Sequence, residues 1–207
     1  MIMNIAIIGT GNIGGTLAEK WANKGHNIYL GVRDTSNFKG QRLVEHPSIS
    51  AVDIHTAVQA SEVVVLATPA MLAVEVAQSL GDTTGKIIID TMNIVMGRGP
   101  AGFATTSEAI LAHANTRDVV KCFNTTGFNN MQNPFYQGEA IDMFMAGDST
   151  RGKAIAAQLA LEVGFSDCHD IGGNDKFAQM EEFARFWINL AMFQGMGRDF
   201  AFKLKRR

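Results

Sequence analysis

The 207-residue chain is poor in cysteine and carries almost no excess of one charge. Its two cysteines, Cys122 and Cys168, are too few for a disulfide framework, and each stands in a strand-like run where a small buried side chain is usual. We therefore expect a reducing, cytoplasmic setting. The 18 basic and 20 acidic residues give a net charge of −2, which provides no field to attract nucleic acid or an anionic membrane.

Long hydrophobic runs are also missing. The longest near-apolar stretch, residues 63–74, is interrupted by Thr68-Pro69 and falls short of the roughly 20 residues that span a bilayer. The apolar N-terminus has no basic residue before Lys20, so we expect a first strand there and no signal peptide. With 46% hydrophobic residues, the composition is typical of a globular protein of one compact unit.

Short apolar runs alternate with helical patterns along the chain. Runs such as Val63-Val64-Val65-Leu66 and Ile87-Ile88-Ile89 are continuous, which is typical of strands covered by helices on both faces of a parallel sheet. This predicts an α/β fold. Strands are predicted over residues 4–8, 27–32, 49–54, 62–67, 86–89, 119–123, 141–146 and 165–171. Helices are predicted from residue 13 to 21 and over residues 71–80, 107–114, 151–163 and 175–194.

A glycine loop follows the first predicted strand directly. Gly9-Thr10-Gly11-Asn12-Ile13-Gly14 fits the pattern G-x-G-x-x-G and opens a helix, as in units that bind the pyrophosphate of a dinucleotide. Gly9 would permit the tight turn, Gly11 the approach of the pyrophosphate, and Gly14 the packing of helix on strand. A glycine turn without a ligand is the alternative.

The end of the second predicted strand favours NADP over NAD. NAD-binding units usually place a carboxylate there, whereas this strand ends in Gly31-Val32-Arg33-Asp34. Arg33 could form paired hydrogen bonds to a 2′-phosphate, and Lys39 would add charge. Asp34 could bind the ribose instead, but we expect it to cap a turn through Thr35-Ser36.

Signatures of several other reaction classes are absent. No Tyr-x-x-x-Lys pair is present, and the five histidines show no metal-ligand spacing, so we expect no metal site. No placed acid or base stands out as a catalytic residue, which favours an acceptor that delocalises charge in a conjugated ring, such as a deazaflavin or flavin.

The chain resembles the NADPH-dependent reductases of the deazaflavin coenzyme F-420. The resemblance rests on residues 9–15, Gly25-His26 with Gly31-Val32-Arg33, Thr68-Pro69, and Asn189 with residues 193–197. The larger group includes the NADPH domains of STEAP-type metalloreductases, which residues 119–125 resemble more closely. The family resemblance implies a doubly wound Rossmann fold with a parallel sheet over residues 1–172. It also implies a small C-terminal helical extension, over residues 173–207, that completes the substrate cleft.

The resemblance also implies roles for residues of this sequence. Thr10, Gly11, Asn12 and Ile13 would bind pyrophosphate and Arg33 the 2′-phosphate, while Thr68, Pro69 and Asn93 would border the nicotinamide. The substrate contacts would be Asn124, Thr125 and Met196. Asn124 stands where the deazaflavin reductases tend to have His, and Gly127 where they tend to have Pro.

Three functions follow as hypotheses. The first is hydride transfer between NADPH and coenzyme F-420 or FMN/FAD, the second a flavin-mediated ferric or cupric reductase, and the third a redox sensor that binds NADPH without turnover. The extension would act as a lid or as a homodimer contact. The basic residues 203–207 are expected to form a solvated tail.

Overall fold

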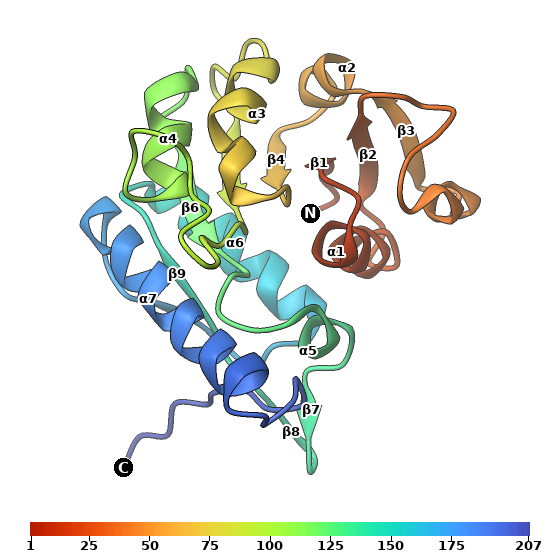
Figure 1. The fold of residues 1–207 in the computed structure, drawn as a ribbon. Helices are drawn as coiled ribbons and strands as arrows, with labels where there is room; N and C mark the ends of the chain where they lie inside the picture. Colours follow the sequence, from red (N-terminus) through yellow and green to blue (C-terminus); the bar gives the residue numbers. More distant parts are fainter.

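A computed structural model describes all 207 residues, and its apolar runs form one eight-stranded sheet (Figure 1). The sheet order is β10-β9-β6-β5-β4-β1-β2-β3, and every neighbouring pair is parallel except β6 and β9. The strands are β1 (Asn4–Ile8), β2 (Asn27–Val32), β3 (Ile49–Asp53), β4 (Val63–Leu66), β5 (Ile87–Asp90), β6 (Val119–Cys122), β9 (Met143–Ala146) and β10 (Cys168–Asp170). The part β3-β2-β1-β4-β5-β6 has the strand order of doubly wound dinucleotide-binding folds, which confirms the predicted fold class.

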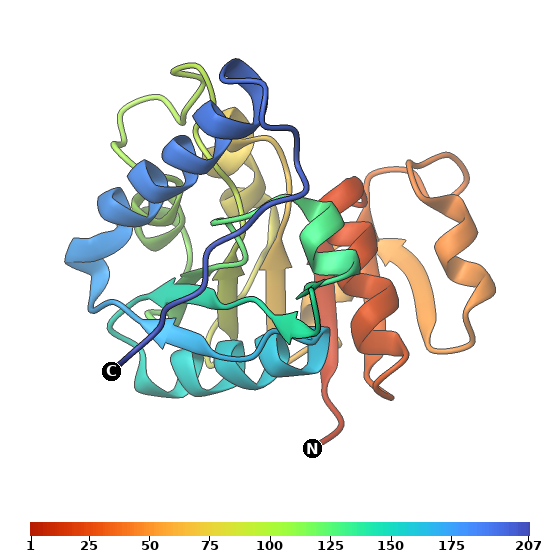
Figure 2. The ribbon, with the colours of Figure 1, turned by 90° about the horizontal axis from the view of Figure 1, so that it is seen from below.

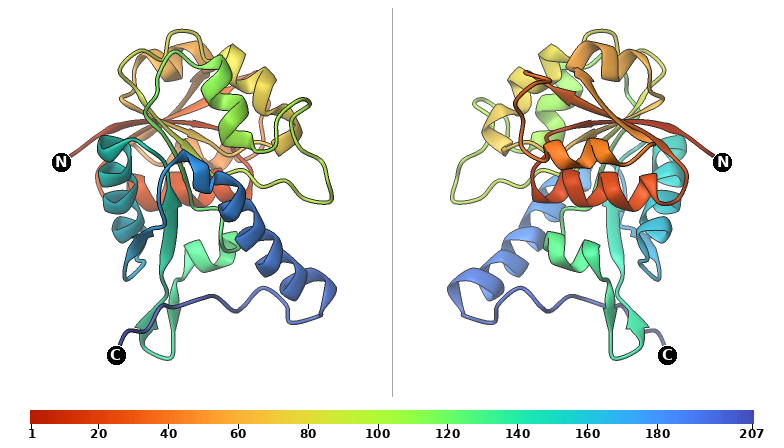
Figure 3. Two further views of the ribbon diagram at one scale, coloured as in Figure 1. Left: turned by 90° about the vertical axis from the view of Figure 1, so that its left-hand side faces the viewer. Right: turned by 90° about the vertical axis from the view of Figure 1, so that its right-hand side faces the viewer.

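Helices cover both faces of this sheet, which is why β4 and β5 are buried along their whole length (Figure 3). The helices are α1 (Asn12–Ala22), α2 (Ile54–Gln59), α3 (Ala73–Ser79), α4 (Thr106–His113), α5 (Phe128–Gln132), α6 (Thr150–Val163) and α7 (Phe177–Ile188). Side chains of α1 and α6 fill one core, and those of α2, α3 and α4 fill the other. The α1 and α6 helices also meet through Trp21, whose Nε1 donates to the carbonyl of Leu159 at 3.0 Å.

Several short elements were not predicted. The third strand ends at Asp53, one residue earlier than predicted, because Asp53 caps α2 and accepts from the Thr56 N–H at 3.0 Å. The single-turn segments η2 (Ala70–Leu72) and η3 (Asn174–Lys176) overlap the starts of the helices predicted over residues 71–80 and 175–194. The helices α2 and α5, the single-turn segment η1 (Gln41–Glu45), and the hairpin β7 (Phe135–Tyr136) with β8 (Glu139–Ala140) were not predicted. They are too short to show a periodic apolar pattern. None of the helices has the length and apolar character that crossing a membrane requires.

A buried histidine ties the amino end of the sheet to α6. His26 Nδ1 accepts from the Met3 N–H at 3.0 Å, so the ring proton lies on Nε2. Nε2 in turn donates to Glu162 Oε2 at 2.7 Å. This pair lies at the end of the sheet opposite to the glycine loop.

Residues 173–207 form η3, α7, a π-helical turn η4 (Asn189–Phe193) and an extended tail that returns along β9 and the hairpin (Figure 2). The boundary at residue 172 stays a prediction. We expected residues 203–207 to form a solvated tail, but the structure shows part of this segment bonded to the protein. Lys203 Nζ donates to the Ala140 carbonyl at 2.6 Å, and the Leu204 N–H donates to Asp142 Oδ2 at 2.8 Å. Two basic side chains are thus bonded, since Lys205 also pairs with Glu139.

Asp142 should make stability depend on pH in acid. Burial disfavours its charged form, but hydrogen bonds from Ser166, the Leu204 N–H and His169 outweigh burial and lower the pKa from 3.8 to about 2. Because the folded-state pKa is depressed, this stabilisation is complete above the unfolded pKa and is lost as the pH falls through about 2. We expect Asp142→Asn to lower the free energy of unfolding by about 1–2 kcal/mol at pH 7 and to flatten its decline in acid.

Urea titrations at several pH values would measure this effect. The matched control is Glu62→Gln, which neutralises an exposed carboxylate. A decline in acid that is equally steep in Asp142→Asn and in the unmodified protein would contradict the assignment.

Candidate functional site

The glycine loop links the end of β1 to α1, and its three motif glycines meet three different demands. Gly9 has φ of +104°, and a Cβ there would lie 2.5 Å from the Ala67 carbonyl oxygen. A Cβ on Gly14 would lie 1.9 Å from the carbonyl oxygen of Gly9. A Cβ on Gly11 would meet nothing within 4 Å, so the space beside the Gly11 backbone is open. This geometry matches the roles that the motif predicts for the three positions.

The N-terminus of α1 is left without a side-chain cap. Its N-cap is Gly11, which has no side chain to accept from the first-turn N–H groups. Asn12 is exposed and Ile13 is half-buried at the start of this 11-residue helix. The unpaired N–H groups and the positive end of the helix dipole together suit a pyrophosphate. The space beside Gly11 is open, and a Cβ at this position would reduce it.

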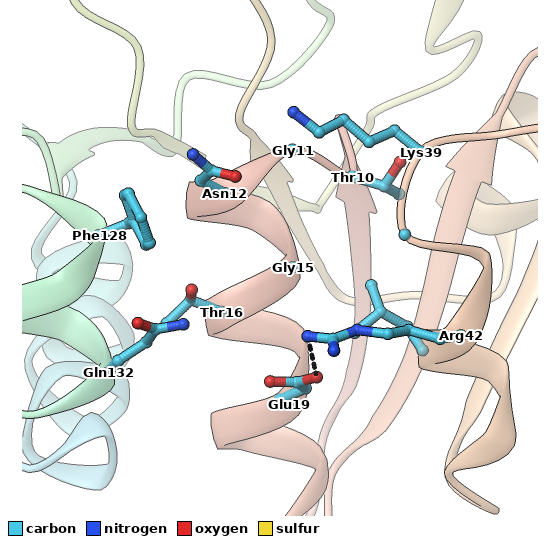
Figure 4. A pocket seen from close by; sticks show the side chains of 12 residues that line it. Thr10, Gly11, Asn12, Gly15, Thr16, Glu19, Lys39, Arg42, Phe128 and Gln132 are labelled. Carbon is cyan, nitrogen blue, oxygen red and sulfur yellow. Dashed lines mark ion pairs between the residues drawn. The ribbon is translucent and has the colours of Figure 1, made fainter.

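A groove of about 200 Å³ lies beside this loop, between α1, η1 and α5 (Figure 4). Thr10, Gly11, Asn12 and Lys39 of the predicted site line it. The other lining residues are Gly15, Thr16, Glu19, Gly40, Arg42, Leu43, Phe128 and Gln132, none of which was predicted. They come from segments that only the fold brings together.

The cations near the groove come from the segment after β2. Arg33 follows β2 directly and is exposed, but it does not line the groove. Arg42 does, and its guanidinium lies 3.7 Å from Glu19 of α1 (Figure 4). Asp34 accepts from both the N–H and the hydroxyl of Ser36, at 2.9 and 2.6 Å, which confirms the predicted turn and lowers the pKa of its carboxyl.

The residues expected around the nicotinamide lie at the carboxyl ends of β4 and β5, outside that groove. Thr68 is half-buried and its hydroxyl donates to Met92 Sδ at 3.2 Å, while Pro69 is exposed. Asn93 is half-buried and its Nδ2 donates to the Asn124 carbonyl at 2.7 Å. These residues and the glycine loop occupy neighbouring strand ends at one edge of the sheet, where such folds bind ligands.

The expected substrate contacts differ in exposure. Asn124 and Thr125 are 2% and 3% exposed, whereas Met196 is 57% exposed. Asn124 Nδ2 donates to Asn93 Oδ1 at 3.0 Å and to the Met180 carbonyl of α7 at 3.2 Å, but its buried Oδ1 has no partner. Thr125 donates to Met143 Sδ at 3.5 Å. Their contact with a substrate stays a prediction.

A buried group of charges at these strand ends was missed. Asp90 ends β5 and Lys121 lies within β6, both 0% exposed, and Glu181 of α7 is 3% exposed. Two signals in the sequence could have found the first pair: an acidic residue closing Ile87-Ile88-Ile89, and a lone Lys between Val120 and Cys122 in an apolar strand. Glu181 could not be found in this way, because its partners lie far away in the sequence.

Two further features concern metal binding and thiol chemistry in the chain. No three His, Cys, Asp or Glu side chains are grouped so that they could hold a metal ion. Cys122 and Cys168 are both free and buried, as predicted, with their sulfur atoms 3.9 Å apart. Burial raises the pKa of the Cys122 thiol well above its ordinary value, so the reactive thiolate is disfavoured.

Comparison with known proteins identifies a similar family and similar folds. Residues 4–94 match the family described as NADP oxidoreductase, coenzyme F-420-dependent. A protein from an Arthrobacter species, described provisionally as an F-420-dependent NADP-reductase, is 28% identical, with a TM-score of 0.83 over 99% of this chain and 100% of its own. A hypothetical protein from Sinorhizobium meliloti is 24% identical, with a TM-score of 0.71 over 83% of this chain and 86% of its own.

A reductive aminase from Aspergillus terreus, solved with NADPH and ethyl levulinate, shares the fold. It is 20% identical with a TM-score of 0.66, and the match covers 94% of this chain but 63% of that longer protein. The resemblance found in the sequence is thus confirmed by the matched segment and by the fold. The protein is an NADP-dependent oxidoreductase, and its residues 4–94 resemble the coenzyme F-420-dependent family.

Proposed function

We propose that the protein transfers a hydride between NADPH and a planar, conjugated acceptor, with coenzyme F-420 as the first candidate and FMN or FAD as the alternative. The observation that carries this proposal is the state of the ionisable groups at the strand ends. Asp90 and Lys121 are fully buried and bonded to each other at 3.0 Å, so neither is free to protonate a product. An acceptor that spreads the incoming charge over its ring needs no such proton donor. The description of the 28% identical Arthrobacter protein supports the same acceptor.

The residues of this chain would bind and orient the two rings. The N–H groups at the start of α1 would hold the pyrophosphate, and Arg33 with Lys39 the 2′-phosphate. Thr68, Pro69 and Asn93 would border the nicotinamide. When bound, NADPH supplies the hydride from its nicotinamide ring, and the protein's contribution is to hold donor and acceptor close together.

An anaerobic assay that follows NADPH absorbance would test the acceptor. It should compare F-420, FMN, FAD, ferric chelates and a cyclic imine at equal concentrations. Turnover with F-420 or a flavin supports the proposal, whereas turnover with the imine or the ferric chelates alone contradicts it. Tight NADPH binding without turnover of any acceptor would favour the redox sensor. The homodimer and the cytoplasmic setting stay proposals, which sedimentation and cell fractionation would test.

Arg33→Ala tests the choice of cofactor. Loss of a charged hydrogen-bond donor should raise the Kd for NADPH by about 10- to 100-fold and change the Kd for NADH much less. Fluorescence titration with both nucleotides would measure this. Arg206→Ala, in the exposed end of the chain, removes the same charge as a control. An equal loss of affinity for NADH and NADPH would refute the assignment of Arg33.

A further inference from the structure

The buried charges at the ends of β5 and β6 form one connected network. The ammonium of Lys121 lies 3.0 Å from Asp90 Oδ2 and 2.9 Å from Glu181 Oε1. It also donates to the Thr106 hydroxyl at 2.9 Å, and that hydroxyl lies 2.6 Å from Asp90. Burial opposes the charge on Lys121, but the two carboxylates outweigh it and raise the pKa of the ammonium. The network thus carries two negative charges and one positive charge inside the protein.

The side chains of Asp90, Lys121 and Glu181 also form hydrogen bonds with the backbone on both sides of Asn93. Asp90 Oδ1 accepts from the Met92 N–H at 2.9 Å, and Lys121 Nζ donates to the Met92 carbonyl at 2.9 Å. Glu181 Oε2 accepts from the Ile94 N–H at 2.9 Å. Three backbone groups next to Asn93 are therefore held by side chains from β5, β6 and α7.

The partner of Asn93 is held in an unusual way as well. Asn93 and Asn124 exchange hydrogen bonds at 2.7 and 3.0 Å. Phe123, directly before Asn124, is fully buried with φ of +59°, a conformation that is rare and strained for an aromatic residue. Its ring packs against Trp21 at 5.5 Å between centroids, which helps to hold this backbone in place. Both members of the amide pair thus lie on backbone that the surrounding structure fixes.

Stability alone gives no reason for this arrangement. Burying charges costs free energy that their attraction barely recovers, and well-packed apolar residues would often serve equally well. A network that binds the backbone at three points supplies something that an apolar cluster cannot, namely a defined direction for the side chain between them.

We propose that Asp90, Lys121 and Glu181 are positioning residues that fix the Asn93–Asn124 amide pair against the nicotinamide end of NADPH. This inference rests on the proposed function, because it takes the nicotinamide to lie at the ends of β4 and β5. The C-terminal extension takes part through Glu181, so it shapes the cofactor site as well as any cleft for the acceptor.

Two ligands that differ only in the nicotinamide riboside end test the proposal. The Kd is measured for NADPH and for 2′-phospho-ADP-ribose, which keeps the pyrophosphate and 2′-phosphate but lacks the nicotinamide. Glu181→Gln keeps the shape of the side chain but loses one acceptor oxygen and the charge. We expect it to reduce the preference for NADPH over the fragment by about fivefold or more, with the Kd of the fragment unchanged. Asn93→Ala should reduce the same preference, and it keeps the test decisive if Glu181→Gln folds poorly.

Glu162→Gln is the matched control, since it weakens the pairing of half-buried Glu162 with buried His26 at the opposite end of the sheet. It should lower the melting temperature without changing the ratio of the two Kd values. An unchanged ratio in Glu181→Gln, or in Asn93→Ala, would overturn the inference, as would an unmodified protein that binds the two ligands equally well. An unmodified protein that binds neither ligand would instead overturn the proposed function.

Discussion

Lys121→Met is expected to lower the free energy of unfolding by about 3–5 kcal/mol, because it leaves two buried carboxylates without a counter-charge. Asp90 and Glu181 both lie within 3.0 Å of the Lys121 ammonium, and both are buried. The methionine fills much of the same volume, so the loss comes from charge and not from a cavity. Chemical denaturation at pH 7 would measure the change.

Neutralising the whole network is the control for this prediction. The triple variant Lys121→Met, Asp90→Asn and Glu181→Gln removes all three charges, and it should recover most of the lost stability. The amide at position 90 can still accept hydrogen bonds from Thr106 and Ser107, which both bond Asp90 at 2.6 Å. A triple variant as unstable as Lys121→Met would mean that packing of the lysine stem, not its charge, matters at this position.

Gly14→Ala is expected to lower the free energy of unfolding by about 2–3 kcal/mol and to weaken NADPH binding together with it. The added methyl would lie 1.9 Å from the Gly9 carbonyl oxygen and 3.1 Å from Ile7 Cγ2, so the loop must move away from α1. Backbone cannot yield as a flexible side chain does. Since the same loop would hold the pyrophosphate, its displacement should also reduce the affinity for NADPH. Thermal unfolding and fluorescence titration would follow the two effects.

Two neighbouring glycines separate folding from binding. Gly11→Ala adds a methyl to open space at φ of −73°, so stability should change by less than about 0.5 kcal/mol. The methyl would nevertheless obstruct a pyrophosphate, and we expect the affinity for NADPH to fall about tenfold or more. Gly15→Ala, whose methyl would lie 3.6 Å from Leu43 Cδ1, should not lower the free energy of unfolding, because alanine is a better helix former than glycine inside α1. Normal NADPH affinity in Gly11→Ala would refute the predicted role of the loop.

Much of the fold was predictable because its strands and longer helices carry strong local signals. The strands β1 and β2 begin and end where predicted, and α6 differs from its prediction by one residue. Continuous apolar runs indicate burial on both faces of a sheet, and four-residue spacing indicates one buried face of a helix. The antiparallel pairing of β6 with β9 was not predicted, because nothing in either strand specifies the direction of its neighbour.

The candidate site also contains one part that the sequence predicted and one part that it did not predict. The glycine loop was predictable because its chemistry lies in a continuous segment, where spacing and residue type carry the information, whereas the role of Arg33 stays a prediction. The sequence by itself thus determined an α/β fold, a loop suited to a pyrophosphate, and a cation beyond the second strand. The grouping of Asp90, Lys121 and Glu181, the exchange of hydrogen bonds between Asn93 and Asn124, and the docking of the tail on Asp142 were decided only by the tertiary structure. They join residues that lie tens of positions apart, and such contacts form only when the sheet and α7 have packed together.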